Sequence, residues 1–339
     1  MNLASNYTIA VDAMGGDNAP NKILEGINLY LKNNHDIKFH LFGDEKLIID
    51  RISKFKNFNK NNYKITNSPN IIPDKGSVRN AIRNGKKSSM WMAIDCVKNN
   101  NADLVISAGN TGALLVISKL LLKSIDGVNK PAIAGIWPTF KNPCIVLDLG
   151  ANVEFSEKNY VDFSKIGSSL FKVLFSNNSP SVSLLNIGSE DSKGNIKIKN
   201  ANDILKKSNN DFNYRGYIEG NQIKDGNIDV IVTDGFAGNI SLKTAEGTAN
   251  FITQEIKKIF SKTLYGKICY IFCYFIFKKI KKNLDPRKYN GGIFLGLNNP
   301  VIKSHGGSDG LAFFYSIELS AKIIKGDLIK KIKQKIFNE

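Results

Sequence analysis

The chain has 339 residues, of which 42% are hydrophobic, and 47 basic against 30 acidic residues give it a formal net charge of +17. This length is ample for a deep core in one large or two intermediate domains, and the composition is that of an ordinary soluble protein. The four cysteines form no CxxC pair and the three histidines are scattered, which argues against a disulfide framework and a histidine-based metal site.

The basic excess has two interpretations. It can signal nucleic acid, an anionic membrane or an acidic protein as a partner. The sequence is also crowded with Lys, Asn and Ile, as AT-rich coding produces, so only local clusters of charge are informative. The N-terminus lacks the basic-then-apolar pattern of a signal peptide, and a cytoplasmic location is expected.

Hydrophobic periodicity predicts strands and helices that alternate along the chain. Strands are predicted at 7–14, 39–43, 63–68, 104–107, 132–136, 144–149, 182–187 and 230–233. Helices are predicted after Asn18, which could cap the first one, over 45–56, 88–99, 111–123 and 159–175, and from about 238. This order indicates an α/β fold, with a doubly wound, mainly parallel sheet and helices on both faces. No repeat or linker divides residues 1–339, which we take as a single unit.

Five of the predicted strands end in loops of small and polar residues that open into helices. The loops are 12–20, 107–113, 148–152, 186–191 and 233–239. Glycine allows a close backbone approach, and a helix N-terminus adds unpaired N–H donors with partial positive charge. Any one loop is explained as an ordinary βα connection, which favours the same residues. Five together favour one anion site, most simply for phosphate, beyond the carboxyl ends of the strands.

The stretch 255–282 differs from the rest, with eight lysines against Glu255 alone. Between Lys267 and Lys278 lie ten apolar or aromatic residues, which as a helix span only about 15 Å, too little to cross a bilayer. One interpretation is a basic, aromatic helical hairpin that turns near Gly266 and lies on an anionic membrane surface. The other is a helix buried in a dimer interface, and both could hold for different faces.

Seven strings run in order through almost the whole chain: IAVDAMGGDNAP, KKSSM, ISAGNTGALL, LDLGANVE, LLNIGSEDSKGN, VTDGFAGNISLKTAEG and VIKSHGGSDG. Over residues 7–325 they closely resemble the bacterial phosphate acyltransferases of the PlsX family. The resemblance implies transfer of a fatty acyl group from acyl carrier protein to inorganic phosphate, giving acyl phosphate for phospholipid synthesis. It also implies the fold of isocitrate and isopropylmalate dehydrogenases without their cofactor, and we expect no metal and a homodimer.

The residues agree with this chemistry, because phosphate is already an anion and needs a holder and oxyanion donors more than a strong base. Lys193 follows a strand and could supply an ammonium, although a solvated loop lysine is the simpler interpretation. Asn239 stands at the start of the last predicted helix and could donate its amide to the same anion or cap that helix. The resemblance implies that Lys193 and Asn239 are the active-site residues.

Substrate contacts are expected from the Gly loops and their neighbours: Gly15, Gly16, Asn110, Thr111, Asn152, Gly235, Gly238, Lys243 and His305. Lys243 could instead pair with Glu246 at i, i+3 spacing, and His305 could make a structural hydrogen bond. The carboxylates of Asp12, Asp17 and Asp148 would repel phosphate, so we expect them to accept N–H bonds and shape the loops.

The chain departs from the family pattern at two places. Asn18 stands where many members have His, so no imidazole role is assumed there. The usual basic run before Ser-Ser-Met is Arg83-Asn84-Gly85-Lys86-Lys87 here, which leaves Lys86 and Lys87 to dock the acidic carrier protein.

Two other functions agree with part of the sequence. An acyl-CoA-dependent phosphate acyltransferase shares the fold and the chemistry, but no GxGxxG fingerprint follows the first strand. A non-enzymatic, basic membrane-surface or nucleic-acid-binding protein would explain 255–282 and leave the five loops without a purpose. We therefore expect a cytoplasmic enzyme, peripherally associated with membrane, that has no nucleic-acid partner.

Overall fold

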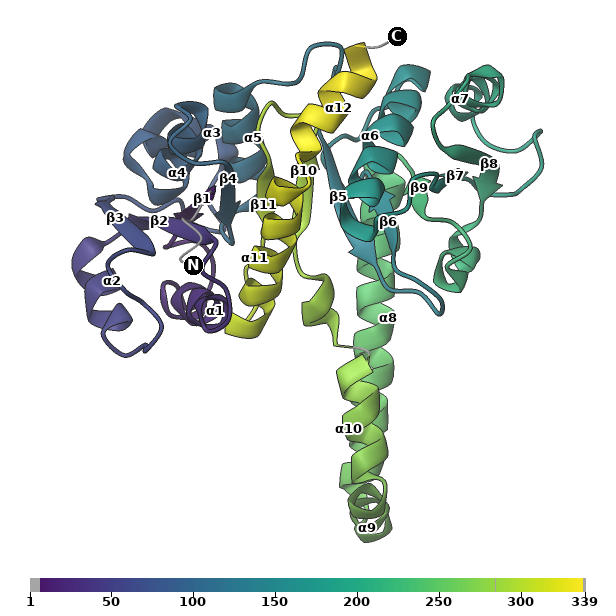
Figure 1. Cartoon of the computed structure of the whole chain (residues 1–339). Coiled ribbons are helices and arrows are strands. Elements are labelled where there is room, and N and C mark those ends of the chain that lie inside the picture. Colours follow the sequence, from purple (N-terminus) through teal and green to yellow (C-terminus); the bar gives the residue numbers. More distant parts are fainter. Residues whose placement is uncertain (1–6, 284, 338–339) are drawn as a thin grey trace.

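Within the described residues, eleven strands form one sheet in the order β3-β2-β1-β4-β11-β10-β5-β6-β9-β7-β8 (Figure 1). The strands are β1 (Tyr7–Asp12), β2 (Ile37–Gly43), β3 (Tyr63–Asn67), β4 (Leu104–Ser107), β5 (Ala132–Trp137), β6 (Cys144–Leu147), β7 (Ser181–Leu185), β8 (Asn213–Ile218), β9 (Val230–Val232), β10 (Gly292–Leu295) and β11 (Val301–Lys303). This computed structural model describes residues 7–283 and 285–337, with backbone alone over 280–283, so the side chains of Lys281 and Lys282 lie outside the described part.

Helices connect most of these strands. The α-helices are α1 (Asn21–Leu31), α2 (Glu45–Ile52), α3 (Val78–Asn84), α4 (Ser89–Lys98), α5 (Thr111–Leu122), α6 (Glu157–Phe175), α7 (Ile196–Lys207), α8 (Gly235–Lys262), α9 (Leu264–Phe272), α10 (Tyr274–Asn283), α11 (Gly310–Lys325) and α12 (Leu328–Phe337). The described residues also form three 3₁₀ turns. These are η1 (Gly85–Lys87) between α3 and α4, η2 (Gly220–Asp225) between β8 and β9, and η3 (Pro286–Tyr289) between α10 and β10.

Helices cover both faces of the sheet. Alternate residues of a strand point to opposite sides, and here both sets are apolar. Ile9 and Val11 of β1 pack into a core that includes residues of α1, α6 and α11. Ala10, between them, belongs to a second core with residues of α4 and α5. On that second face, Val146 of β6 lies in a smaller cluster against which Leu242 of α8 packs. The predicted α/β fold, a mainly parallel sheet with helices on both faces, is confirmed.

The strands fall into two parallel groups of opposite direction. β3, β2, β1, β4 and β11 run parallel to one another, and β10 is antiparallel to both β11 and β5. β6 is antiparallel to β5, and β9, β7 and β8 follow β6 in its direction. All five predicted loops follow carboxyl ends, and the reversed direction of β6 divides them into two groups. Loops 12–20 and 107–113 form one group, and 148–152, 186–191 and 233–239 form the other.

Two helix starts differ from prediction. Asn18 does not cap α1, because it lies outside the helix with φ 56° and its Oδ1 accepts from Asn21 Nδ2 at 3.3 Å. Pro20 occupies the N-cap position without a side-chain bond. α8 begins at Gly235, three residues before the predicted start at 238, because Asp234 caps it by accepting from Ala237 N at 2.9 Å.

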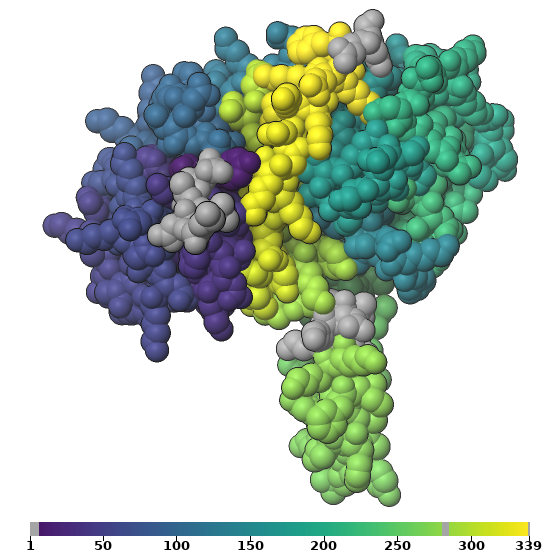
Figure 2. Space-filling view, viewed as in Figure 1, coloured from purple at the N-terminus to yellow at the C-terminus, as the bar shows by residue number. Residues whose placement is uncertain are grey.

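Residues 255–283, here called the arm, project away from the body of the protein (Figures 1 and 2). α8 ends at Lys262, Thr263 caps α9, and α10 returns alongside α8. The return is fixed by aromatic contacts, with the Phe260 ring centroid 4.9 Å from that of Phe277 and 6.3 Å from that of Tyr270. The stretch expected as a hairpin turning near Gly266 thus runs as three helices, with Gly266 in the first turn of α9. None of the described helices is both long and apolar enough to cross a membrane.

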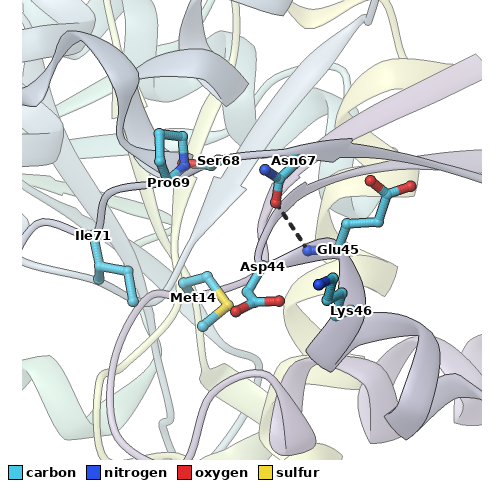
Figure 3. Close-up of a pocket in the computed structure, with 8 residues that line it drawn as sticks. All are labelled: Met14, Asp44, Glu45, Lys46, Asn67, Ser68, Pro69 and Ile71. Atoms are coloured by element: carbon cyan, nitrogen blue, oxygen red, sulfur yellow. Dashed lines mark hydrogen bonds between the residues drawn. The ribbon is translucent and has the colours of Figure 1, made fainter.

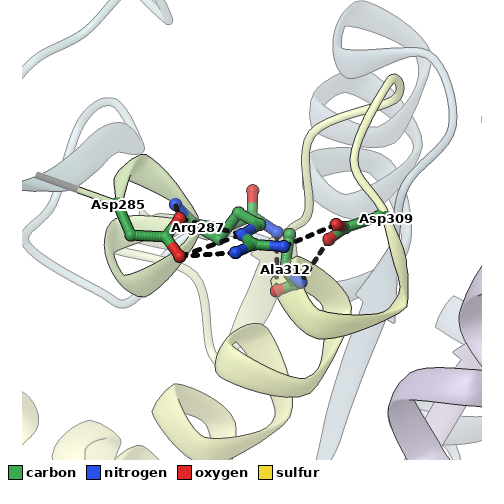
Figure 4. Close-up of polar contacts among 5 residues, drawn as sticks. Asp285, Arg287, Asp309 and Ala312 are labelled. Atoms are coloured by element: carbon green, nitrogen blue, oxygen red, sulfur yellow. Dashed lines mark hydrogen bonds and ion pairs between the residues drawn. The ribbon is translucent and has the colours of Figure 1, made fainter. Parts of the chain in front are cut away.

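The chain that leaves the arm is fastened to the body by Arg287 (Figure 4). Its guanidinium donates to Asp285 at 2.8 Å through Nε and at 2.6 Å through Nη2. Nη1 donates to Asp309 Oδ2 at 2.8 Å, and Oδ1 of Asp309 caps α11 by accepting from Ala312 N at 2.9 Å. The root of the arm is therefore bonded to the N-terminus of α11.

Candidate functional site

The loops after β1, β4 and β11 meet at Gly16. A Cβ atom at Gly16 would lie 2.7 Å from Ala108 O and 2.9 Å from Gly306 O, and its φ of +77° also favours glycine. Gly15 is equally confined, since its Cβ would lie 2.6 Å from both Asp12 Oδ2 and Gly109 N. Only glycine allows the three loops to approach this closely.

The side chain of Asp12 holds the loops after β1 and β4 together through hydrogen bonds. Its carboxylate is buried and accepts from Ser107 Oγ at 2.6 Å and from Met14 N at 3.3 Å. Burial raises the pKa of Asp12 above its ordinary value, while the Ser107 hydroxyl acts in the opposite direction. The prediction that this carboxylate accepts N–H bonds and shapes its loop agrees with these contacts.

Asn110 and Thr111, predicted as substrate contacts, begin α5. Asn110 is the N-cap, with Oδ1 accepting from Ala113 N at 2.9 Å. Its Nδ2 donates to the backbone carbonyls of Asp74 and Gly76. The side chain of Asn110 is thus occupied in joining two loops, whereas Thr111 is exposed.

The loops after β6 and β9 form the second meeting point, around Asp148. This carboxylate accepts from Ile133 N at 2.9 Å and from both the backbone N and Nδ2 of Asn152 at 2.8 Å. Asn152 Nδ2 also donates to the carbonyl of Pro131 at 2.7 Å, so the side chain predicted as a substrate contact joins its loop to the residue before β5. A Cβ at Gly235 or Gly238 would collide with backbone of this same loop.

Asn239 is the fifth residue of α8 and points to the loop after β6. Its Nδ2 donates to Leu149 O at 3.2 Å, and a Cβ at Gly150 would lie 2.6 Å from that nitrogen. The alternative role of Asn239 as the helix cap is wrong, because Asp234 is the cap.

Lys193 lies in the loop after β7, which pairs in parallel with β9. The loop is held by Asn186 Nδ2, which donates to Lys193 O at 3.2 Å, and by Lys193 N, which donates to Glu190 O at 3.0 Å. The Lys193 side chain is exposed. Because β7 and β9 are neighbours, Lys193 and Asn239 follow adjacent strand ends at one edge of the sheet.

His305 follows β11 and lies in the loop that meets Gly16. Its Nδ1 accepts from Gly307 N at 3.2 Å, which leaves the proton of a neutral imidazole on Nε2 as a donor. Burial, followed by the charge of Lys303, lowers the pKa of His305. Lys243 and Glu246 of α8 also act on this imidazole, and they form the predicted ion pair at 2.9 Å. Lys243 and Glu246 of α8 therefore lie within electrostatic range of the 304–308 loop.

Asn290, which the sequence analysis does not single out, holds this loop in place. Its Nδ2 donates to Ser304 Oγ at 2.9 Å and to Ser316 Oγ at 3.0 Å, while Oδ1 accepts from His305 N at 3.1 Å. Its position before two glycines is a local signal of a turn, but not of these partners.

A pocket of about 380 Å³ opens beside the first meeting point, at the carboxyl ends of β1, β2 and β3 (Figure 3). It is lined by Met14, Asp44, Glu45, Lys46, Asn67, Ser68, Pro69 and Ile71. Asn67 Oδ1 accepts from Glu45 N at 3.2 Å across it. With two carboxylates and one lysine, this pocket is a poor anion site and suits a neutral, partly apolar group.

The predicted docking lysines lie at another rim of the first group. Lys86 and Lys87 are exposed in η1, directly after α3, where Arg79 and Arg83 are also exposed. Among the described residues, no three His, Cys, Asp or Glu side chains cluster as metal ligands would. The arrangement supplies glycine loops, helix N-termini and amide, imidazole and ammonium donors, which together suit an anionic substrate.

The family described as fatty acid synthesis protein matches residues 7–331. The phosphate acyltransferase of Pelagibacter ubique is 51% identical over 329 residues, covering 97% of this chain and 98% of that protein. The phosphate acyltransferase of Xanthobacter autotrophicus is 40% identical, covering 97% and 92%.

Solved structures resemble the chain in fold. A phosphotransacetylase from Streptococcus pyogenes superposes with a TM-score of 0.65 at 15% identity, covering 94% of each chain. The EutD phosphotransacetylase from Staphylococcus aureus gives 0.61 at 16% identity, covering 95% of each. At such identities the likeness concerns the fold alone.

Proposed function

Because this chain belongs to the phosphate acyltransferase family, whose members are enzymes that move an acyl group onto phosphate, we propose that its acyl donor is a fatty acyl thioester of the acyl carrier protein. A phosphate oxygen attacks the thioester carbonyl carbon. That carbon becomes tetrahedral, and the former carbonyl oxygen becomes an oxyanion. The C–O bond forms, the C–S bond breaks, and the carrier thiol leaves with a proton. The acyl phosphate produced would supply phospholipid synthesis.

One observation carries the proposal, namely a site rich in donors for anions and without a cysteine nucleophile. The glycine loops meet at Gly16 and around Asp148, and the donors of Asn239 and His305 lie beside them. Cys96 and Cys144 are buried elsewhere, and the other two cysteines lie on the arm. Such a site favours direct attack by phosphate, with the oxyanion stabilised by fixed donors.

Asn239 and Lys193 are proposed as the oxyanion and phosphate donors. Nδ2 of Asn239 has a second N–H beyond the bond to Leu149, and that donor can meet the tetrahedral oxygen. Lys193 is long and exposed, so its ammonium can reach over the adjacent strand end to the same oxygen or to phosphate. Gly235 and Gly238 allow the N-terminus of α8 to lie against the β6 loop, which keeps these donors close.

The direct test incubates the purified chain with phosphate and either acyl-carrier thioester or acyl-CoA, and traps acyl phosphate as a hydroxamate. We expect product from the carrier thioester and little from acyl-CoA. Faster turnover of acyl-CoA would assign the donor to coenzyme A, and absence of product from both would reject the proposed function.

Docking of the carrier protein is proposed at the basic rim, defined as Lys75, Arg79, Arg83, Lys86 and Lys87, all of them exposed. The rim adjoins the Asn110 loop, because Asn110 Nδ2 donates to Gly76 O. An acidic partner would be attracted here by complementary charge, close to the loops that hold the reacting groups.

A homodimer is proposed through an apolar stripe on α8. Phe236, Ile240 and Phe251 lie on one face of the helix, four and eleven residues apart, and are exposed by 61%, 50% and 66%. A stripe this apolar on an ordinary monomer surface is unusual, and a second copy of the same helix would cover it.

Association with an anionic membrane is proposed through the tip of the arm. Tyr265, Phe272 and Phe275 are exposed by 83%, 81% and 79%, and lysines of the arm flank them. Apolar side chains on such a surface can enter the headgroup region while the lysines attract anionic lipid. The enzyme would then lie on the cytoplasmic side as a peripheral protein.

A further inference from the structure

Two lysines that the sequence analysis does not single out lie where the loops after β1, β4 and β11 meet. Lys22 in the first turn of α1 is 2% exposed, and its Nζ donates to Gly306 O. A Cβ at Gly16 would lie 2.8 Å from that Nζ. Lys22 therefore lies directly beneath the glycine loop.

Lys303, the last residue of β11, reaches the same place from the neighbouring strand. Its Nζ donates to Ala108 O at 3.2 Å and to Ser304 O. The side chain is half-buried, so it is more accessible from outside than Lys22. Both ammoniums thus point at the backbone of the same glycine loops.

Neither ammonium has a carboxylate partner within the described part of the chain, where the ion pairs involve other residues. Asp12 and Asp74 act on Lys303, and Asp17 and Asp74 act on Lys22, only through the electrostatic field. Each ammonium has three N–H donors, and these hydrogen bonds to backbone carbonyls use one for Lys22 and two for Lys303. Donors therefore remain for a ligand.

The two lysines are also costly to hold without an anion. Burial lowers the pKa of both, and for Lys303 it lowers the pKa to about 8. Each also lies in the repulsive field of the other. An anion beside them would offset both costs. Both lysines act on His305, on which Lys243 of α8 acts as well.

We propose that Lys303 binds inorganic phosphate directly at the meeting of the Gly16, Ala108 and Gly306 loops. Lys22 is a positioning residue that fixes Gly306 and adds positive charge from beneath. This phosphate subsite rests on the proposed acyl transfer and names the residues that would hold its acceptor substrate. In catalysis the subsite presents a phosphate oxygen toward the donors of α8.

The test measures binding of inorganic phosphate by calorimetry without any acyl donor, at constant ionic strength. Lys303→Met should weaken binding by about tenfold or more, the scale of losing one charge-assisted hydrogen bond. Lys303→Arg should retain most of the affinity. The matched control is Lys335→Met, because burial also lowers the pKa of Lys335 to about 8, but this lysine pairs with Asp211 and lies on α12.

In steady-state assays Lys303→Met should raise KM for phosphate by a similar factor and leave KM for the acyl donor unchanged. Wild-type affinity in a folded Lys303→Met protein would overturn the proposal, as would an equal loss in Lys335→Met. Lys22→Met is the second variant and should weaken binding by about threefold, less than Lys303→Met. A wild-type protein that binds phosphate yet forms no acyl phosphate would reject the proposed function and leave this subsite standing.

Discussion

The side-chain amide of Asn239 donates to the backbone carbonyl of Leu149 at 3.2 Å, which ties the N-terminal part of α8 to the loop after β6. Gly150 makes the approach possible, because it has φ +125° and its Cβ would lie 2.6 Å from the amide nitrogen. An amide fixed in this way keeps its second N–H at a constant place. Preorganised donors of this kind stabilise developing charge without reorganising during the reaction.

We expect Asn239→Ala and Lys193→Ala each to lower kcat by about 10²-fold or more, the scale for removing one preorganised donor. Turnover is measured as acyl phosphate formed at saturating substrates, and circular dichroism checks the fold. Lys197→Ala is the matched control for Lys193, since Lys197 is also exposed, on the following helix α7. Near-normal rates in both variants would show that Asn239 and Lys193 are not catalytic residues.

The sequence predicts the alternation of strands and helices and the five loops because each has a local signal. The run Leu104–Ser107 is buried on both faces, and the Gly-Asn-Thr that follows starts α5, as predicted. The reversed direction of β6 has no such signal, because it depends on pairing with β5 and on the insertion of β10 between distant segments. Without that reversal the five loops would be expected at one edge.

The candidate site was predictable only in part for the same reason. Glycines and helix caps can be recognised from the local sequence. The hydrogen bonds that engage the side-chain amides of Asn110 and Asn152 cannot, because their partners lie on other loops. Lys303 follows two apolar residues, Val301 and Ile302, and the sequence gives no sign that its Nζ donates to Ala108 O in the loop after β4. Contacts between segments far apart in sequence therefore decide which polar side chains remain available for substrate.

We expect activity to survive chelation. No described His, Cys, Asp or Glu side chains form a group that could hold a metal ion, and glycine loops with ammonium donors can bind phosphate by themselves. Acyl phosphate formation is measured before and after treatment with EDTA. A loss that a divalent ion restores would contradict a metal-independent mechanism.

Carrier affinity should depend on salt and on the basic rim. Exposed charges are screened over about 8 Å at physiological ionic strength, so affinity for the carrier should fall as salt rises. Lys86→Ser with Lys87→Ser should raise KM for the carrier by about threefold to tenfold and flatten that dependence. Lys60→Ser with Lys207→Ser removes the same charge from exposed positions outside the rim. Equal effects of the two double variants would contradict docking at the rim.

The lowered pKa of Lys303 should appear in the pH dependence of stability. The folded protein releases this proton near pH 8, because burial outweighs the fields of Asp12 and Asp74, and the field of Lys22 adds to the release. The unfolded chain releases it near 10.5, so between these values the unfolded state binds more protons and stability rises with pH. Relative to Lys303→Met, the wild type should gain about 2 kcal/mol between pH 7 and pH 10 in urea unfolding. A difference that does not change with pH would contradict the burial of this charge.

The tip of the arm should bind the membrane, whereas the part of α8 before the arm should bind the second subunit. Phe272 and Phe275 are exposed near the tip, on α9 and α10, whereas Phe251 lies on the apolar stripe of α8 closer to the body. Phe272→Glu with Phe275→Glu should abolish flotation with anionic vesicles, because it removes the apolar contact and cancels lysine charges worth up to about 1 kcal/mol each at the surface. The dimer should persist in that variant. Phe251→Glu should do the reverse, giving monomers in sedimentation that still float, since the tip is intact. If the double variant at the tip yields monomers that bind vesicles normally, the tip is the subunit interface and the proposed membrane contact is wrong.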